Sequence, residues 1–192
     1  MKILVAGNPD YGLSQSIAKS QLDLDFCSRT YGNWDLTQYQ MQIDFAEKSL
    51  DYDVVISVSC LWKHHQTNLV QEVARKWIEH KKDGYLIVVG SSADTPVKGT
   101  AWMYPAEKKA LRAYCRQLSQ ISAGENESSI KVTYISPGNM HTPKQDKKMP
   151  NTPKLDTDYV ADVIKWLINQ PKDVNISEIC LDKVIKLSSE NK

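Results

Sequence analysis

The sequence predicts an α/β fold in which a doubly wound parallel sheet of the Rossmann type lies between layers of helices. Two observations favour this class: short runs rich in Val and Ile recur along the chain, and segments with helical periodicity lie between them. Continuous apolar runs of this length are typical of strands covered on both faces. Regular alternation of strand and helix favours right-handed crossovers, and we expect a single domain over residues 1–192.

Six short apolar runs are the expected strands. In chain order they are KILVAG at 2–7, LDLDFC at 22–27, DVVISVS at 53–59, YLIVVG at 85–90, KVTYIS at 131–136 and SEICLD at 177–182. The connection SRTYGNWDLT at 28–37 follows the second run and is too short to hold a full helix. Ligands of such folds bind at the carboxyl ends of the parallel strands.

Three segments between these runs show the apolar stripe of a helix that buries one face. They span 68–81, 105–121 and 157–170, and Pro171 closes the last of them. A further helix is expected to start near Gln38. These helices supply the layers that a parallel sheet needs on its two faces.

Composition narrows the class of protein. Lys and Arg number 24 and Asp and Glu 23, a net charge of +1 that gives no support for a nucleic-acid or membrane-surface protein. No apolar run approaches the roughly 20 residues that span a bilayer, and the N-terminus is a poor signal peptide, so we expect a cytoplasmic protein. The cysteines and histidines lack metal-ligand spacing, which predicts reduced thiols and no metal; the cysteines are Cys27, Cys60, Cys115 and Cys180.

A glycine turn follows the first strand in VAGNPDYGLSQSIA. Gly7 and Gly12 would let the backbone turn tightly and bring N–H groups close to a pyrophosphate. The motif is imperfect, because four residues separate the two glycines and Ser14 stands where a third glycine is often found. Two glycines after a strand are also a common turn, so both interpretations stay open.

The end of the second strand carries information on cofactor preference. An acidic residue there would hold adenine ribose hydroxyls, whereas a basic one accommodates a 2′-phosphate. The strand ends in Cys27, Ser28 and Arg29, and an Arg fork matches phosphate geometry well. This predicts NADP in preference to NAD, with a solvated loop arginine as the alternative.

Tyr104 and Lys108 lie four residues apart in MYPAEKKAL. With 9 Tyr and 20 Lys, about one such pair is expected by chance, so the spacing alone is weak evidence. Its context adds weight, because the pair follows the strand YLIVVG, and Pro105 suits the first turn of a helix. Positions i and i+4 share a helix face, which would place the phenol and the ammonium one turn apart.

With these motifs in order, the sequence resembles the short-chain dehydrogenase/reductase family over nearly the whole chain, as a compact member. The resemblance rests on five motifs that follow the family's order. They are the glycine turn AGNPDYGLS, TNLVQE with Asn68, IVVGSS with Ser92, YPAEK with Tyr104 and Lys108, and ISPGNMHTP with Pro137, Gly138 and Thr142. Each is weak alone, and their order on the expected elements makes them specific together.

The resemblance implies a role for each catalytic residue. Tyr104 would exchange a proton with the substrate oxygen, and the nearby charge of Lys108 would lower the pKa of its phenol. Ser92 would hydrogen-bond the substrate oxygen, with Ser91 as a competing candidate because of its spacing to Tyr104. Asn68 would hold a water that links Lys108 to solvent; the alternative for this residue is a helix cap.

The resemblance also implies a set of cofactor-binding residues spread over the strand ends. In addition to Lys108, they are Gly7, Asn8, Tyr11, Gly12, Leu13, Ser28, Arg29, Asp35, Leu36, Val58, Ser59, Pro137, Gly138, Met140 and Thr142.

Two departures from the family pattern bear on the fold and the site. The family's Asn-Ala-Gly run is replaced by SVSC, which ends in Cys60, so close approach of the backbone to the cofactor is altered there. One helix and most of the third strand are missing after the second strand. We therefore expect a sheet shortened around the third strand, with six strands plus a stub at WDLT and one edge less covered.

The segment 138–157 normally closes over substrate in the family. It contains three prolines and four lysines, and we expect an irregular, mobile loop. Its lysines (Lys144, Lys147, Lys148 and Lys154) are either a solvated basic surface or an attraction for an anionic substrate or an acidic partner.

These features predict an NADP(H)-dependent oxidoreductase that interconverts a carbonyl and an alcohol with a Ser-Tyr-Lys set. One rival is a dinucleotide-binding sensor or scaffold without turnover. Another is a sugar-nucleotide reductase or epimerase-like enzyme, which little chain after the sixth strand disfavours. Helices 68–81 and 106–121 resemble those that pair across subunits in the family, which suggests a homodimer or homotetramer.

Overall fold

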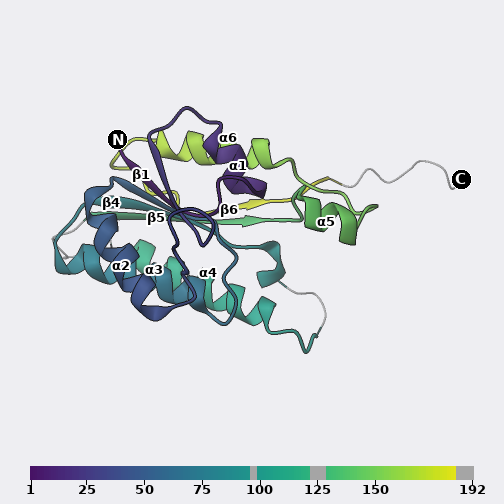
Figure 1. The fold of residues 1–192 in the computed structure, drawn as a ribbon, viewed down its shortest axis with the longest axis horizontal. Coiled ribbons are helices and arrows are strands. Elements are labelled where there is room, and N and C mark those ends of the chain that lie inside the picture. The colour runs from purple at the N-terminus through teal and green to yellow at the C-terminus, as the bar shows by residue number, and fades with distance from the viewer. Residues whose placement is uncertain (96–98, 122–128, 185–192) are drawn as a thin grey trace, which may run out of the picture.

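A computed structural model describes residues 1–95, 99–121 and 129–184 (Figure 1). Within these ranges one six-stranded sheet has the order β2-β1-β3-β4-β5-β6, and every neighbouring pair is parallel. Its strands are β1 Ile3–Ala6, β2 Leu24–Cys27, β3 Val54–Ser57, β4 Gly84–Val89, β5 Ile130–Pro137 and β6 Glu178–Leu181. The predicted doubly wound parallel fold is confirmed.

Helices cover both faces of the sheet (Figure 1). One layer consists of α1 Gly12–Ala18 and α6 Thr157–Ile168, which contact each other. The other layer consists of α2 Tyr39–Lys48, α3 His65–Glu79 and α4 Tyr104–Ile121. Three short helices complete the described elements: η1 Ser49–Asp51, η2 Ser92–Asp94 and α5 Pro143–Lys148.

Alternation along the strands divides the core between the two layers. In β1, Leu4 and Ala6 belong to the cluster under α2, α3 and α4, while Ile3 and Val5 belong to the cluster under α1 and α6. Successive side chains of a strand point to opposite faces, and here both faces are buried. This explains why the strands read as continuous apolar runs.

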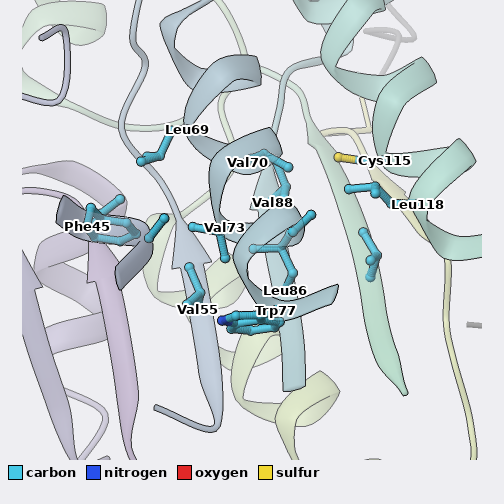
Figure 2. Close-up of a cluster of buried hydrophobic side chains, with 14 of the residues drawn as sticks. Phe45, Val55, Leu69, Val70, Val73, Trp77, Leu86, Val88, Cys115 and Leu118 are labelled. Carbon is cyan, nitrogen blue, oxygen red and sulfur yellow. The ribbon is translucent and has the colours of Figure 1, made fainter. Parts of the chain in front are cut away.

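Trp77 on α3 belongs to the larger cluster, and Figure 2 shows its ring near Leu86 and Val55. The indole is fully buried, and its Nε1 donates to Ser49 Oγ at 2.9 Å. Its ring lies so close to Gly84 that an added Cβ would meet Trp77 Cζ3 at 2.5 Å. Tryptophan and glycine therefore fit each other as a pair at the start of β4.

The sheet is shortened as predicted, but the expected stub is wrong. Residues 28–38 are all described and add no strand to the sheet; Ser28 and Tyr31 form only an isolated antiparallel bridge. Leu36 is buried in the core instead, with Trp34 packed against the same cluster. The apolar residues of WDLT are explained by this packing, and β2 is left as the sheet edge.

The segment 138–157 contains structure that its composition concealed. Thr142 caps α5, accepting a hydrogen bond from Gln145 N at 3.2 Å, and Pro143 occupies the first turn. Met140 and Leu155 pair in a parallel bridge. The expectation of an irregular loop is therefore wrong for 143–148, while its motion stays a prediction.

No helix of the described residues is both long and apolar enough to cross a membrane.

Candidate active site

The strand order defines where a site can form. β1 lies between β2 and β3, so the strand order changes direction at β1. The strand that follows β1 in the chain is its neighbour on one side, and the next strand is its neighbour on the other side. In open α/β sheets ligands bind at this switch point, outside the carboxyl ends of the strands. A cavity of about 930 Å³ lies there, bordered by the connections that follow β1 through β5.

Most of the predicted site residues line this cavity. They are Asn8, Tyr11, Gly12, Leu13, Ser28, Arg29, Asp35, Leu36, Val58, Ser59, Ser92, Tyr104, Pro137, Gly138, Met140 and Thr142. Three predicted residues do not line it: Gly7, Asn68 and Lys108. The cavity thus brings together the segments that the resemblance assigns to cofactor and substrate.

Tyr104 and Lys108 share one face of α4. Tyr104 begins the helix and lines the cavity, and Lys108 lies one turn further with a side chain that is almost fully buried. The Lys108 Nζ atom is 5.4 Å from the centroid of the Tyr104 ring. The pair therefore points inward rather than to solvent, as the i, i+4 spacing predicts.

Gln66, rather than Asn68, is the amide beside Lys108. Lys108 Nζ donates to Gln66 Oε1 at 2.5 Å, and Gln66 Nε2 donates to Val89 O at 2.9 Å. Asn68 is exposed on α3 and does not line the cavity, so the structure does not bring it to Lys108, and its role with a bound water stays a prediction. Gln66 lies on the same buried stripe of α3 as Leu69 and Val70, which turns it toward the sheet.

Ser91, rather than Ser92, contacts the phenol. The Ser91 side chain acts to lower the pKa of the Tyr104 phenol and also caps η2, accepting from Ala93 N at 3.2 Å, whereas Ser92 is the first residue of η2. Ser91 N donates to Tyr134 OH at 3.3 Å, which fixes the backbone at the end of β4. Ser92 still lines the cavity, but the competing candidate Ser91 is the one in position to bind a substrate oxygen beside Tyr104.

Burial dominates the electrostatics of the pair. The pKa of Tyr104 is raised, first by burial and next by the charge of Cys60, and the hydrogen bond from Ser91 acts in the opposite direction. Burial also lowers the pKa of Lys108. Burial therefore sets the direction of the pKa shift of the phenol, and the lowering of that pKa by Lys108 stays a prediction.

A buried polar network beneath the site was not predicted. Asp94 accepts hydrogen bonds from Tyr134 OH at 2.9 Å and from Arg112 Nη1 at 3.1 Å. Arg112 also pairs with Glu178 on β6. These contacts connect η2, α4, β5 and β6, and they hold the turn that carries Ser91. Only the periodic position of Arg112 on α4 was visible in the sequence, because its partners lie 18 and 66 residues away.

The two glycines of the glycine turn have different surroundings. Ser14, at the position where a third glycine is often found, packs onto Gly7, where an added Cβ would meet its Oγ at 2.3 Å. Gly12 has a positive φ of 54° and faces Thr142 across the cavity mouth. Gly7 therefore serves packing, while Gly12 gives the backbone an open approach to a ligand.

Arg29 and Asp35 come from the connection that follows β2. Both line the cavity, and Arg29 is exposed there at the end of β2. The pKa of Asp35 is lowered, first by hydrogen bonds within the turn from Thr37 and more weakly by the charge of Arg29. A phosphate would meet a guanidinium at this place with a carboxylate nearby.

The lysines of 138–157 divide into two kinds. Lys144 and Lys148 line the cavity, and Lys147 does not. Lys154 is buried. Its Nζ atom donates to Met149 O at 2.6 Å and lies 3.4 Å from Asp146 Oδ1. The segment is therefore less basic toward solvent than its composition indicates. Among the described residues no cluster of three metal-ligating side chains occurs.

Comparisons with known proteins agree with this geometry. No family model matches the chain. An uncharacterized oxidoreductase of Staphylococcus epidermidis is 27% identical over 161 residues, which are 80% of this chain and 66% of the relative. The chain therefore spans just under two thirds of the length of that curated relative.

Solved structures share the fold across almost the whole chain. A short-chain dehydrogenase/reductase family protein superimposes with a TM-score of 0.73 at 14% identity, covering 94% of this chain and 95% of its own. A serine dehydrogenase complexed with NADP+ gives 0.70 at 16% identity, covering 93% of each chain. A 4-hydroxyisoleucine dehydrogenase complexed with NADH gives 0.70 at 17%, covering 95% of this chain and 97% of its own. The chain has the fold of short-chain dehydrogenases/reductases, and the resemblance seen in its motifs extends to its architecture.

Proposed function

We propose that this protein is an NADP(H)-dependent oxidoreductase that interconverts a carbonyl and an alcohol. One observation carries the proposal: Tyr104 lines the cavity together with Ser91 and Gly12, and the Nζ atom of buried Lys108 is 5.4 Å from the centroid of its ring. This arrangement sets a proton donor beside the space where a nicotinamide ring would lie. The names of the relatives and the cofactors of the structural neighbours support the same activity class.

Each catalytic side chain has a distinct task. A bound nicotinamide would supply the hydride that reaches the carbonyl carbon. Tyr104 donates its phenolic proton to the carbonyl oxygen. The hydride on carbon and this proton on oxygen together give the alcohol. The Ser91 hydroxyl donates a hydrogen bond to the same oxygen while negative charge develops on it.

Tyr104 keeps its proton at neutral pH, because burial raises the pKa of its phenol. The protonated phenol is the form that carbonyl reduction uses, whereas oxidation of an alcohol needs the phenolate as a base. Lys108 supplies the positive charge that stabilises this phenolate once the proton has left. Gln66 holds the Lys108 ammonium in place and thereby acts as a positioning residue.

Arg29 supports NADP as the preferred cofactor. Its exposed guanidinium borders the cavity at the end of β2, where an adenosine 2′-phosphate would lie. A planar arginine binds phosphate through two parallel hydrogen bonds, and the adenosine ribose of NAD carries no phosphate at this position.

Loss of the Tyr104 hydroxyl tests the proposal. Tyr104→Phe should reduce NADPH-dependent carbonyl reduction at least 100-fold, because general acid catalysis is typically worth about 10²–10⁴-fold. The measurement is NADPH oxidation at 340 nm with a carbonyl panel, and binding of NADPH by titration should stay within about threefold. Tyr159→Phe is the matched control, since Tyr159 is exposed on α6, away from the cavity.

Two results would count against this function. Full turnover in Tyr104→Phe would remove the proposed acid. NADPH binding without turnover of any carbonyl by the wild-type protein would favour the sensor or scaffold. The expected homodimer or homotetramer is part of this proposal and would be measured by analytical ultracentrifugation.

A further inference from the structure

Two tryptophans lie beside the proposed proton donor. Trp62 follows β3 and Trp102 precedes α4, and both line the cavity. The Trp102 ring stacks on Tyr104 with centroids 5.0 Å apart and an interplanar angle of 26°. Trp62 contacts both rings, at 5.2 Å from Tyr104 and 5.8 Å from Trp102. The three rings form a continuous aromatic wall next to the reacting hydroxyl.

Both indoles keep a large free surface. The exposed fraction is 47% for Trp62 and 53% for Trp102, whereas Trp77 in the core has none. Tryptophan offers a wide, rigid π-surface that aromatic rings bind in offset-stacked or edge-to-face geometry. The free faces of this wall therefore offer a surface on which a flat aromatic ring can stack.

The Trp62 segment is held in place rather than loosely attached. Lys63 and His64 both have left-handed backbone conformations, with φ of 58° and 62°. Lys63 N donates to the buried Glu107 carboxylate at 3.1 Å, which ties the segment to α4, the helix of Tyr104. Left-handed non-glycine residues are costly, and they persist where surrounding contacts fix them, often at functional sites. The segment that carries Trp62 is therefore fixed to the helix that carries Tyr104, which fixes the position of the wall relative to the phenol.

We propose that this wall selects planar aromatic carbonyl compounds as substrates. An aromatic aldehyde or ketone would stack its ring on Trp102 or Trp62 and place its carbonyl oxygen near Tyr104 and Ser91. This inference rests on the proposed reductase function and adds the substrate class to it. Bound substrate would cover indole surface that is otherwise in contact with water.

A pair of matched aldehydes tests the selection. Benzaldehyde and cyclohexanecarbaldehyde have the same ring size and reacting group, but only the first is flat. The ratio of their kcat/KM values with NADPH should favour benzaldehyde at least fivefold in the wild-type protein. Trp102→Leu and Trp62→Leu should each lower this ratio by about threefold or more. Trp166→Leu is the matched control, because Trp166 is an exposed tryptophan on α6 outside the cavity and should not change the ratio.

A binding measurement separates failure of this inference from failure of the proposed function. Saturation-transfer NMR in the presence of NADP+ compares benzyl alcohol with cyclohexylmethanol, and needs no turnover. Stronger saturation of benzyl alcohol, lost in Trp102→Leu and kept in Trp166→Leu, supports the wall even when no aldehyde is reduced. Equal binding and equal kcat/KM for the flat and puckered compounds would overturn the inference while leaving the reductase proposal intact.

Discussion

Lys108 is a lysine whose cost to the fold can be measured. Its side chain is almost fully buried on α4, and burial lowers its pKa. Its described partners are the Gln66 amide oxygen and the face of the Tyr104 ring, neither of which carries a full negative charge. A cation held this way is weakly compensated, which is typical of residues kept for chemistry rather than for stability.

Replacement of Lys108 by Met should flatten the pH dependence of stability in the alkaline range. A lysine with a lowered pKa binds fewer protons when folded than when unfolded, so its presence makes the free energy of unfolding rise with pH. That rise ends near the ordinary value of 10.5 and begins at the lowered value in the folded protein. Urea unfolding from pH 8 to 10 should show a smaller rise for Lys108→Met than for the wild type.

The quantity to compare is the slope of the free energy of unfolding against pH. The absolute free energy is less informative, because Lys108→Met also leaves the Gln66 oxygen without its partner. Lys109→Met is the control, because Lys109 is the exposed neighbour on the same helix. Parallel curves for Lys108→Met and the wild type would contradict the assigned cost of burial.

Cys60 offers a chemical probe of the same site. It is exposed and lines the cavity together with Tyr104, whose pKa it helps to raise. The buried Cys27 and Cys115 are protected by burial, which raises their pKa values, to about 12 for Cys27. Thiolate is the reactive form of cysteine, so alkylation should reach exposed thiols first.

Iodoacetamide should therefore inactivate the enzyme through Cys60, and NADP+ should slow the loss. Cys60→Ser should keep more than half of its activity after the treatment that inactivates the wild type, with intact mass showing one label fewer. Cys180→Ser serves as the control, because Cys180 is the other exposed cysteine and does not line the cavity. Equal inactivation of Cys60→Ser and the wild type would place the reactive thiol elsewhere.

Single residues show where the sequence stops being sufficient. Tyr104 and Lys108 could be predicted, because their spacing on a helix is a local property. Ser91 was predicted only as the competitor of Ser92, and Gln66 was missed in favour of Asn68, two positions away. Their orientation depends on contacts with Tyr134, 43 residues from Ser91, and with Lys108, 42 residues from Gln66. Local spacing does not contain such distant contacts.

At the scale of elements, β4 and α3 are joined by a close fit between Gly84 and Trp77. Gly84→Ala would bring a Cβ to 2.5 Å from the buried indole, which packs among core side chains and cannot retreat (Figure 2). Overpacking of this kind costs about 1–3 kcal/mol of unfolding free energy. Gly99→Ala is the matched control, since an added Cβ there meets no described atom within 4 Å. Urea unfolding with no loss for Gly84→Ala would refute the fit.

The elements differ in how clearly the sequence pattern predicted them. α3, α4 and α6 carry apolar stripes that repeat with the helical period, and each was predicted to within a few residues. α5 buries no side chain, so no stripe marked it, and only Thr142 and Pro143 signalled its start. The apolar residues of 34–36 were assigned to a stub because burial in the core and burial in a sheet select the same residue types.

The whole molecule should respond to NADPH as one unit, because the cavity is bordered by connections from both halves of the sheet. Saturation at about 100 times Kd adds about 2.7 kcal/mol of stability, which raises the unfolding temperature by several degrees. NADPH should give a larger shift than NADH at equal concentration. Arg29→Glu should reverse this order by repelling the 2′-phosphate, and Lys19→Glu, on the exposed surface outside the cavity, should leave it unchanged.

The topology of the whole chain was the most predictable feature, while the aromatic wall was not foreseen. Alternating strands and helices with right-handed crossovers leave few possible arrangements, so patterns alone were enough for the sheet. Trp62 and Trp102 lie 40 residues apart and meet only after β3, α3 and β4 are in place. Neither residue belongs to a periodic pattern, and no sequence signal joined them.

The wall has a practical consequence for redesign. Both tryptophans come from connecting segments, and neither contributes to the two buried clusters under the helices. The residues that stabilise the fold and the residues that would bind the substrate therefore lie in different segments of the chain. Libraries confined to the connections around Trp62 and Trp102 could retarget the enzyme to new carbonyl compounds without a loss of thermal tolerance.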